Sequence, residues 1–63
     1  MIAPVPTHVR AADLTRGRAI PAGVVREVVA WRTVDGLALV DVYVRGSASP
    51  HTYAADAMVE VRP

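Results

Sequence analysis

The sequence predicts a small all-β domain in which five strands form a partly open barrel, with one short helical turn before the last strand. Two long apolar segments are rich in β-branched valine and lack the 3.6-residue period of an amphipathic helix. An Asp-Gly pair at positions 35 and 36 separates them, which is typical of a tight β-hairpin. We therefore expect a central hairpin with shorter strands on either side.

The chain divides into an N-terminal arm and one domain. Residues 1–7 contain two prolines and no periodic pattern, which predicts an extended or disordered arm. Residues 8–63 hold every strand candidate, and a segment of this length is enough for one small core. We expect a single β-barrel domain over 8–63.

Short elements precede the hairpin. Val9–Ala11 is the first strand candidate, residues 12–18 form a turn-rich connection, and residues 19–20 form a second extended piece. Proline at position 21 and glycine at position 23 stand at the second and fourth places of a turn that begins at Ile20. This pattern predicts a type I turn.

The two hairpin strands are expected over residues 24–34 and 37–45. Aspartate followed by glycine tolerates the positive φ angles of a type I′ turn, so a two-residue loop is predicted. Such a loop fixes the register and places Trp31 opposite Val40. A helix over 22–31 is the alternative, because several of its valines also fit helical spacing. The density of β-branched residues and the preceding glycine favour the strand.

This register assigns each hairpin side chain to one of two faces. One face is nearly all apolar and pairs Trp31, Val29 and Glu27 with Val40, Val42 and Val44. It is expected to face the core, so the ring of Trp31 should be buried. The other face carries the candidate partner-binding residues, three apolar or aromatic side chains and three arginines: Val28, Leu39, Tyr43, Arg26, Arg32 and Arg45.

Arg26 and Arg45 are predicted to lie directly opposite each other. Like charges at paired positions destabilise a sheet unless something relieves them, and a phosphate or a partner carboxylate could do so. The alternative is that both side chains extend into solvent, where screening weakens the repulsion. Both interpretations stay open from the sequence alone.

The remaining residues predict a loop, a short strand, a turn and a closing strand. Residues 46–51 have loop composition, and residues 52–54 form a short strand. Residues 55–57 are expected to make the single helical turn, and residues 58–62 alternate as a closing strand.

Several kinds of chemistry are disfavoured by the residue types present. The chain has no cysteine, which removes disulfides, thiolate catalysis and zinc fingers. Its two imidazoles, His8 and His51, are not spaced as metal ligands, and the glycines do not form a phosphate-binding loop. Ser47 or Ser49 with His51 and Asp56 supplies the residue types of a hydrolase triad, but a 63-residue barrel has little room for the required cleft. We expect no enzymatic activity, no cofactor, no metal and no small-molecule substrate.

Two patterns resemble those of a known group of domains. Val9-x-Ala11-x-Asp13-Leu14-x-x-Gly17 and Tyr53-x-x-Asp56-x-x-Val59-x-Val61 look like the start and finish of small SH3-like modules of actinobacteria and their phages. The resemblance implies a five-stranded SH3-like barrel with a helical turn before the last strand. The abundance of alanine, valine and arginine, with no lysine, asparagine or phenylalanine, also indicates a GC-rich gene, which fits a bacterial, phage or mobile-element origin.

The composition favours a binding role. A hydrophobic fraction of 52% is high for a domain with so much surface relative to its volume, so another chain is expected to cover part of it. The leading hypothesis is a protein-interaction or self-assembly module, encoded by a phage or mobile element, that acts as a structural accessory or binds a host protein.

A second hypothesis comes from the arginines. In this alternative the chain is a single-stranded nucleic-acid-binding barrel whose Arg26, Arg32 and Arg45 contact phosphates while Tyr43 stacks on a base. Net charge is +1, so charge alone does not favour it. No membrane-length apolar run and no signal-peptide pattern occur, and a cytoplasmic location without a membrane partner is expected.

Overall fold

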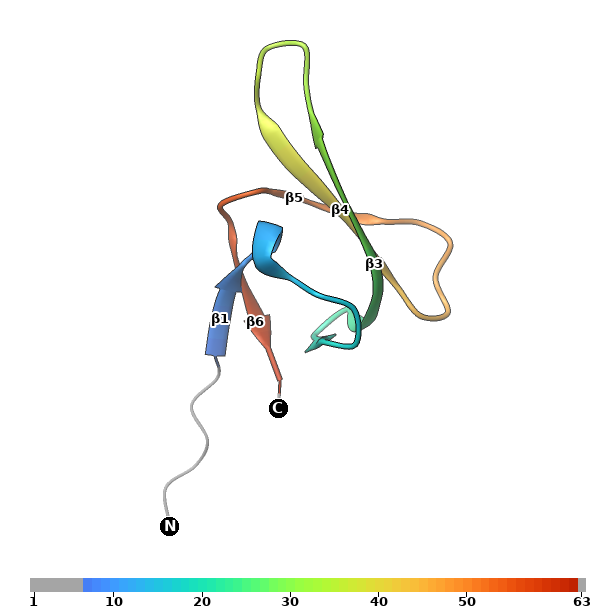
Figure 1. Cartoon of the computed structure of the whole chain (residues 1–63). Coiled ribbons are helices and arrows are strands. Elements are labelled where there is room, and N and C mark those ends of the chain that lie inside the picture. The colour runs from blue at the N-terminus through green and yellow to red at the C-terminus, as the bar shows by residue number, and fades with distance from the viewer. Residues whose placement is uncertain (1–6, 63) are drawn as a thin grey trace.

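The computed structural model describes residues 7–62, and this part of the chain is mostly strand (Figure 1). The elements are β1 (Thr7–Arg10), a 3-10 helix η1 (Ala11–Asp13), β2 (Ala19–Ile20), β3 (Gly23–Arg32), β4 (Ala38–Val44), β5 (His51–Ala54) and β6 (Met58–Val61). The predicted all-β class is confirmed. The predicted arm falls mostly outside the described residues, and its last residue, Thr7, already belongs to β1.

Two antiparallel sheets curl around one core. One has the strand order β2-β3-β4-β5, and the other pairs β1 with β6. The Arg62 N–H donates to the Ala19 carbonyl at 2.7 Å, which links β6 to β2. The N–H groups of Ala11 and Ala12 donate to the carbonyls of Ala57 and Ala55, at 2.8 and 3.0 Å. These bonds tie η1 to the β5–β6 turn, so the sheets form a partly open barrel.

The strand count and the place of the helical turn differ from the prediction. Six strands are present within residues 7–62 because the short piece Ala19–Ile20 pairs with the start of β3 as a strand of its own. Residues 55–57 form a hydrogen-bonded β-turn, in which the Ala57 N–H donates to the Ala54 carbonyl at 3.0 Å. The helical turn lies at Ala11–Asp13 instead, after β1.

The loop between β3 and β4 has three residues rather than two. The Gly36 N–H donates to the Thr33 carbonyl at 3.0 Å, and the Thr33 N–H donates to the Leu37 carbonyl at 2.9 Å. Gly36 has φ +88°, whereas no non-glycine residue within 7–62 has positive φ, so Asp35 does not adopt the type I′ conformation. This is a turn closed by a glycine in the left-handed region. The Thr33 hydroxyl oxygen accepts the Leu37 N–H at 3.1 Å and supports it.

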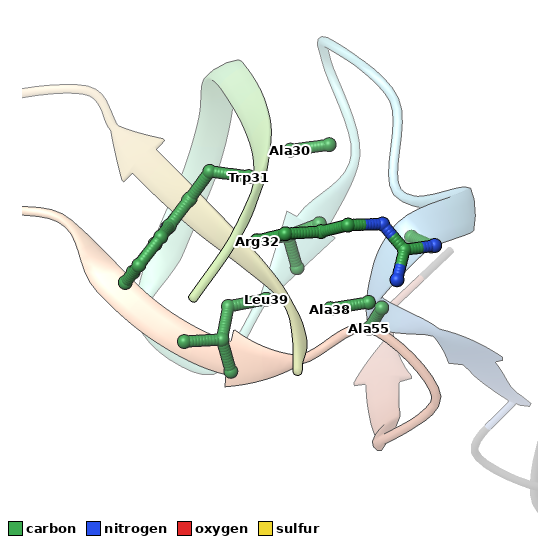
Figure 2. Close-up of a pocket in the computed structure, with 8 residues that line it drawn as sticks. Ala30, Trp31, Arg32, Ala38, Leu39 and Ala55 are labelled. Atoms are coloured by element: carbon green, nitrogen blue, oxygen red, sulfur yellow. The ribbon is translucent and has the colours of Figure 1, made fainter. Parts of the chain in front are cut away.

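The extra loop residue shifts the register by one position. Trp31 pairs with Leu39, Ala30 with Val40 and Val28 with Val42, so the predicted pairing of Trp31 with Val40 is wrong. A one-residue shift exchanges the two faces of a strand. Trp31 is therefore 41% exposed instead of buried. Figure 2 shows Trp31 and Leu39 on one side of the hairpin and Arg32 directed toward the other.

A β-bulge at Arg26 shifts the register once more near the base of the hairpin. Val25 pairs with Val44, whereas Glu27 pairs with Tyr43, so Arg26 is the extra residue. The bulge brings Val25 into the core, where it is fully buried. The predicted direct opposition of Arg26 and Arg45 is wrong, because the loop shift already separates them and the Arg45 N–H donates to the Val24 carbonyl at 2.9 Å.

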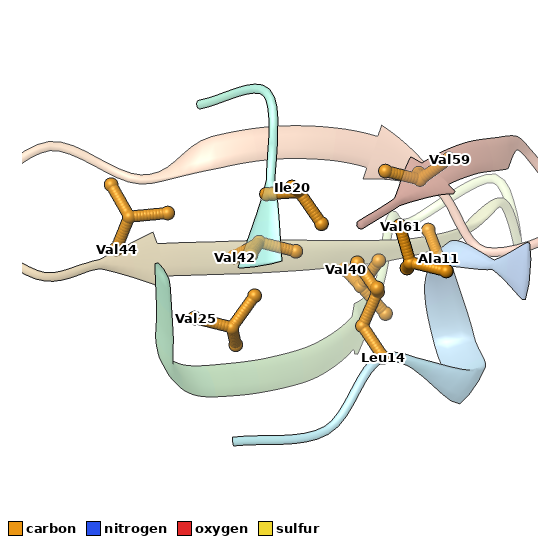
Figure 3. Close-up of a cluster of buried hydrophobic side chains, with 9 residues drawn as sticks. All are labelled: Ala11, Leu14, Ile20, Val25, Val40, Val42, Val44, Val59 and Val61. Atoms are coloured by element: carbon orange, nitrogen blue, oxygen red, sulfur yellow. The ribbon is translucent and has the colours of Figure 1, made fainter. Parts of the chain in front are cut away.

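The core is small and aliphatic. Val25, Val40 and Val42 are its most deeply buried large side chains, and residues 7–62 contain no buried polar side chain. The buried set comes from β2, β3, β4, β6 and the η1 segment, as Figure 3 shows: Ala11, Leu14, Ile20, Val25, Val40, Val42, Val44, Val59 and Val61. These residues lie around the proximal half of the hairpin, and the distal half projects beyond the rest of the domain (Figure 1).

Candidate interaction surface on the central hairpin

The face of the β3–β4–β5 sheet that points away from the core is called the outer face here. The register defines it as three rows across the strands. The distal row is Trp31, Leu39 and Ala54, the middle row is Val29, Asp41 and Thr52, and the proximal row is Glu27 and Tyr43.

The distal part of the outer face exposes apolar side chains. Trp31 and Val29 are each 41% exposed, and Leu37, at the loop, is 63% exposed. Val34, at the tip of the loop, is fully exposed. Large apolar side chains gathered on one exposed face are typical of surfaces that bind other molecules.

Polar interactions border this apolar area on the β5 side. The Thr52 hydroxyl donates to the Asp41 carboxylate at 2.7 Å, so two adjacent strands share a polar contact in the middle row. An apolar centre with a polar border is the usual composition of a protein-protein interface.

Arg26 and Tyr43 form the proximal border. The bulge turns the Arg26 side chain over the Tyr43 ring, with the guanidinium carbon 5.1 Å from the ring centroid. The same guanidinium donates to the Ser47 carbonyl at 3.4 Å. This cation–π contact holds a positive charge at the edge of the outer face.

Two shallow grooves adjoin the distal hairpin. One, of about 400 Å³, lies between the start of β4 and the end of β5 and is lined by Gly36, Leu37, Ala38, Leu39, Ala54, Ala55 and Asp56. The other, of about 250 Å³ (Figure 2), includes Ala12, Ala30, Arg32 and Ala55 in its lining. The smaller groove lies below the roughly 300–1,000 Å³ of ligand pockets and the larger one lies near the lower end of that range.

The six predicted partner-binding residues do not share one face. Leu39 and Tyr43 lie on the outer face, but Val28 pairs with Val42 and packs against the core. The one-residue shift of register separates them. Arg32 lies near the hairpin loop, where its guanidinium donates to the Gly36 carbonyl at 3.2 Å.

Sequence reasoning missed the residues that dominate the outer face. The two-residue loop that Asp35-Gly36 predicts places Trp31 and Val29 on the core face of the hairpin. The signal that could have corrected this is the composition of the loop. Only Gly36 adopts positive φ readily, and a three-residue loop ending in glycine satisfies that preference without strain at Asp35.

A second group of residues gathers at the base of β3. The Gly17 N–H donates to the Val25 carbonyl at 2.8 Å, and the Val25 N–H donates to the Arg18 carbonyl at 2.8 Å. On the other side of β3, the Arg45 N–H donates to the Val24 carbonyl at 2.9 Å. The backbone thus brings four arginines to one end of the barrel: Arg16, Arg18, Arg26 and Arg45. Arg16 and Arg18 were not among the predicted site residues.

No helix within residues 7–62 is long and apolar enough to cross a membrane. The same residues contain no group of three or more histidine or carboxylate side chains placed to hold a metal ion. The Ser47 hydroxyl donates to the Ser49 carbonyl at 3.2 Å, within its own loop. No protein-family model, characterised protein or solved structure matches the chain.

Proposed function

We propose that this chain is a non-enzymatic protein-interaction module that binds another polypeptide through the outer face of its central hairpin. The observation that carries the proposal is the position of Trp31, which is 41% exposed beside the equally exposed Val29. Partly exposed tryptophans with aliphatic neighbours supply large contact area at protein interfaces, and they are enriched among the residues that dominate binding.

The composition of the outer face supports a polypeptide as the ligand. Its distal row is apolar, while Asp41 and Thr52 offer a hydrogen-bonding border and Arg26 offers a charge. Burying the exposed parts of Trp31, Val29 and Leu37 removes apolar area from water, which favours association. The core does not use these side chains, so they are available to a partner.

Further parts of the proposal come from the sequence. The motifs at the two ends of the domain support an SH3-like module, and the composition supports a phage or mobile-element gene acting in a bacterial cytoplasm. In that setting the module serves as a structural accessory or as a binder of a host protein.

The proposed function is tested with two matched substitutions. Trp31→Asp places a charge on the outer face, and Met58→Asp places the same charge at a 60% exposed methionine of β6. The wild type and each variant are immobilised, and the proteins that they retain from an actinobacterial lysate are compared. Light scattering of the free chains measures self-association. We expect Trp31→Asp to abolish retention or self-association and Met58→Asp to preserve it. Equal behaviour of both variants and the wild type would contradict the proposal.

A second candidate function is favoured by the arginines at the base of β3. The hydrogen bonds of Gly17, Val25 and Arg45 bring four arginines to one end of the barrel, which supports single-stranded nucleic-acid binding through phosphates. The test is the salt dependence of oligonucleotide affinity. The logarithm of the affinity falls linearly with the logarithm of the salt concentration. Each lost phosphate contact makes this fall less steep by roughly 0.7.

The matched control for this test is Arg10. It forms an ion pair with Asp13 at 3.3 Å, away from the base of β3. Under the nucleic-acid hypothesis, the salt dependence of oligonucleotide affinity becomes weaker in Arg18→Ala and in Arg45→Ala. It does not change in Arg10→Ala. An oligonucleotide affinity that none of the three substitutions changes would exclude this second function.

A further inference from the structure

We propose that a second copy of this chain pairs with the distal edge of β3, so that two hairpins form one continuous antiparallel sheet with Ala30 opposite its own counterpart. The inference rests on the proposed function and names the partner of that surface. Three features carry it: the open edge of β3, the direction of its backbone groups, and the pattern of side chains along it.

Within residues 7–62, the distal half of β3 has a neighbouring strand on one side only. β2 pairs with β3 at Gly23 and Val24, and the loop before β2 bonds to Val25. From Glu27 to Arg32, β3 pairs with β4 alone. Val29, Ala30, Trp31 and Arg32 are all exposed. An exposed edge of this kind is a template for adding a strand.

The hydrogen bonds of the loop fix which backbone groups point to this edge. The Thr33 N–H donates to the Leu37 carbonyl, so Arg32 and Ala38 form a pair that does not exchange hydrogen bonds. In an antiparallel ladder such pairs alternate with bonded ones, and the N–H and C=O of a non-bonded pair point away from each other. Val28, Ala30 and Arg32 therefore direct their backbone groups to the open edge.

These three residues can bond to the same three residues of a second chain. When Ala30 lies opposite the partner subunit's Ala30, Val28 lies opposite the partner subunit's Arg32. By symmetry, Arg32 lies opposite the partner subunit's Val28. All three outward-pointing residues then take part on each chain. A shift by one pair in either direction leaves one residue of each chain without a partner, so the Ala30-centred register makes the most hydrogen bonds.

Side chains also favour this register. Val29 lies opposite the partner subunit's Trp31 on the outer face, twice by symmetry, and an aromatic residue beside a β-branched one stabilises a sheet. The shift toward the base places Glu27 opposite the partner subunit's Trp31. The opposite shift places Glu27 beside the hairpin loop of the partner subunit, which carries Asp35, and like charges repel there. In the Ala30-centred pairing the two apolar areas are continuous, and Glu27 does not come opposite the partner subunit's Trp31.

Charges at the ends of the paired strands are complementary. Beyond the paired residues, the hairpin loop of the partner subunit, which carries Asp35, points toward the base of β3, where Arg26 and Val25 lie. Arg18 is held at that position by its hydrogen bond from Val25. The acidic loop of each hairpin thus meets the arginine-rich base of the other.

Single-cysteine variants test the register, because the chain has no cysteine of its own. Facing residues of a bonded pair have Cα atoms about 5.5 Å apart, within the range of a disulfide. Val29 and Trp31 are each separated from their own counterparts by about 8 Å, beyond that range. We expect Ala30→Cys to form a disulfide-linked dimer under mild oxidation, and Val29→Cys and Trp31→Cys to stay unlinked. Preferential linking of either control would overturn the register.

A proline substitution tests the backbone pairing. Because the Ala30 N–H points away from β4, Ala30→Pro removes no bond of the hairpin, but it removes two bonds of the dimer. We expect light scattering to give twice the 6.7 kDa chain mass for the wild type at high concentration and the single-chain mass for Ala30→Pro, with unchanged circular dichroism. A folded Ala30→Pro variant that remains dimeric would overturn the inference.

The dimer and the proposed function fail in different ways. A wild type that is monomeric at every concentration, with Trp31→Asp still abolishing retention of another protein, refutes the dimer and leaves the interaction module intact. A dimer that forms in Trp31→Asp as readily as in the wild type overturns the contact of Val29 with the partner subunit's Trp31, and the proposed function fails as well only if Trp31→Asp also retains the other protein.

Discussion

Trp31 lies directly opposite Leu39 across the β3–β4 ladder, on the face of the hairpin that points away from the core. The pair is apolar, yet Trp31 keeps 41% of its surface exposed because no other element of residues 7–62 covers the outer face of the distal hairpin. A one-residue change in the loop decides this arrangement. Had the loop contained two residues, Trp31 would have faced the core, and the outer face would have mixed arginines with apolar and aromatic side chains.

The register predicts a contrast between two valines. Val42→Ala removes two methyl groups from a fully buried site and is expected to lower the free energy of unfolding by about 2 kcal/mol. Val29→Ala, at a 41% exposed site, is expected to change it by less than about 0.5 kcal/mol. Urea denaturation of both variants measures the difference. Equal losses would indicate the two-residue-loop register, in which both valines face the core.

The backbone conformation of the hairpin loop predicts that position 36 favours glycine over other residues. Its φ of +88° lies in the left-handed region, and no atom stands near enough to clash with an added Cβ. Gly36→Ala should therefore cost about 1 kcal/mol from the backbone alone. Gly36→Asn should cost less, since asparagine tolerates this region better. Thermal unfolding compares the two, and an alanine variant as stable as the wild type would contradict the loop.

The contact between Arg26 and Tyr43 predicts a measurable coupling. A guanidinium 5.1 Å from a ring centroid at an exposed site contributes roughly 0.5 to 1 kcal/mol. A double-mutant cycle with Arg26→Ala and Tyr43→Leu should return a coupling energy in this range. Arg45→Ala combined with Tyr43→Leu is the control, and it should be additive.

The charges at the strand ends predict that the dimer depends on salt. Asp35→Arg would place a positive loop against the arginine-rich base of the partner, so the dimer should be weaker and should already dissociate at a higher protein concentration than the wild type. High salt should reduce the difference in dimer stability between Asp35→Arg and the wild type, because salt screens charges at exposed groups. Sedimentation at low and high ionic strength measures both effects. An Asp35→Arg dimer as stable as the wild type at low salt would exclude the charge pairing.

Much of the fold was predictable from local chemistry. Valine-rich segments predicted β3 and β4, the turn from Ile20 to Gly23 lies where proline and glycine placed it, and the closing strand matches β6 to within one residue. Local preference was sufficient there because φ restrictions and β-branching act residue by residue.

The faces of the hairpin were not predictable in the same way. Register depends on the loop length, and Asp35-Gly36 is compatible with two loop lengths that assign every side chain to opposite faces. The bulge at Arg26 adds a second shift that depends on tertiary packing, since it allows Val25 to enter the core. The clustering of Arg16 and Arg18 with Arg45 depends on hydrogen bonds between segments distant in sequence.

The most direct test of the distal hairpin as the contact surface is amide hydrogen exchange followed by NMR at low and high protein concentration. The N–H groups of Val28, Ala30 and Arg32 point away from β4 and should exchange rapidly in the dilute chain. We predict that concentrating the protein slows exchange at these three amides and leaves exchange of the Met58 amide unchanged. Unchanged exchange at all three, in a sample whose mass has doubled, would contradict it.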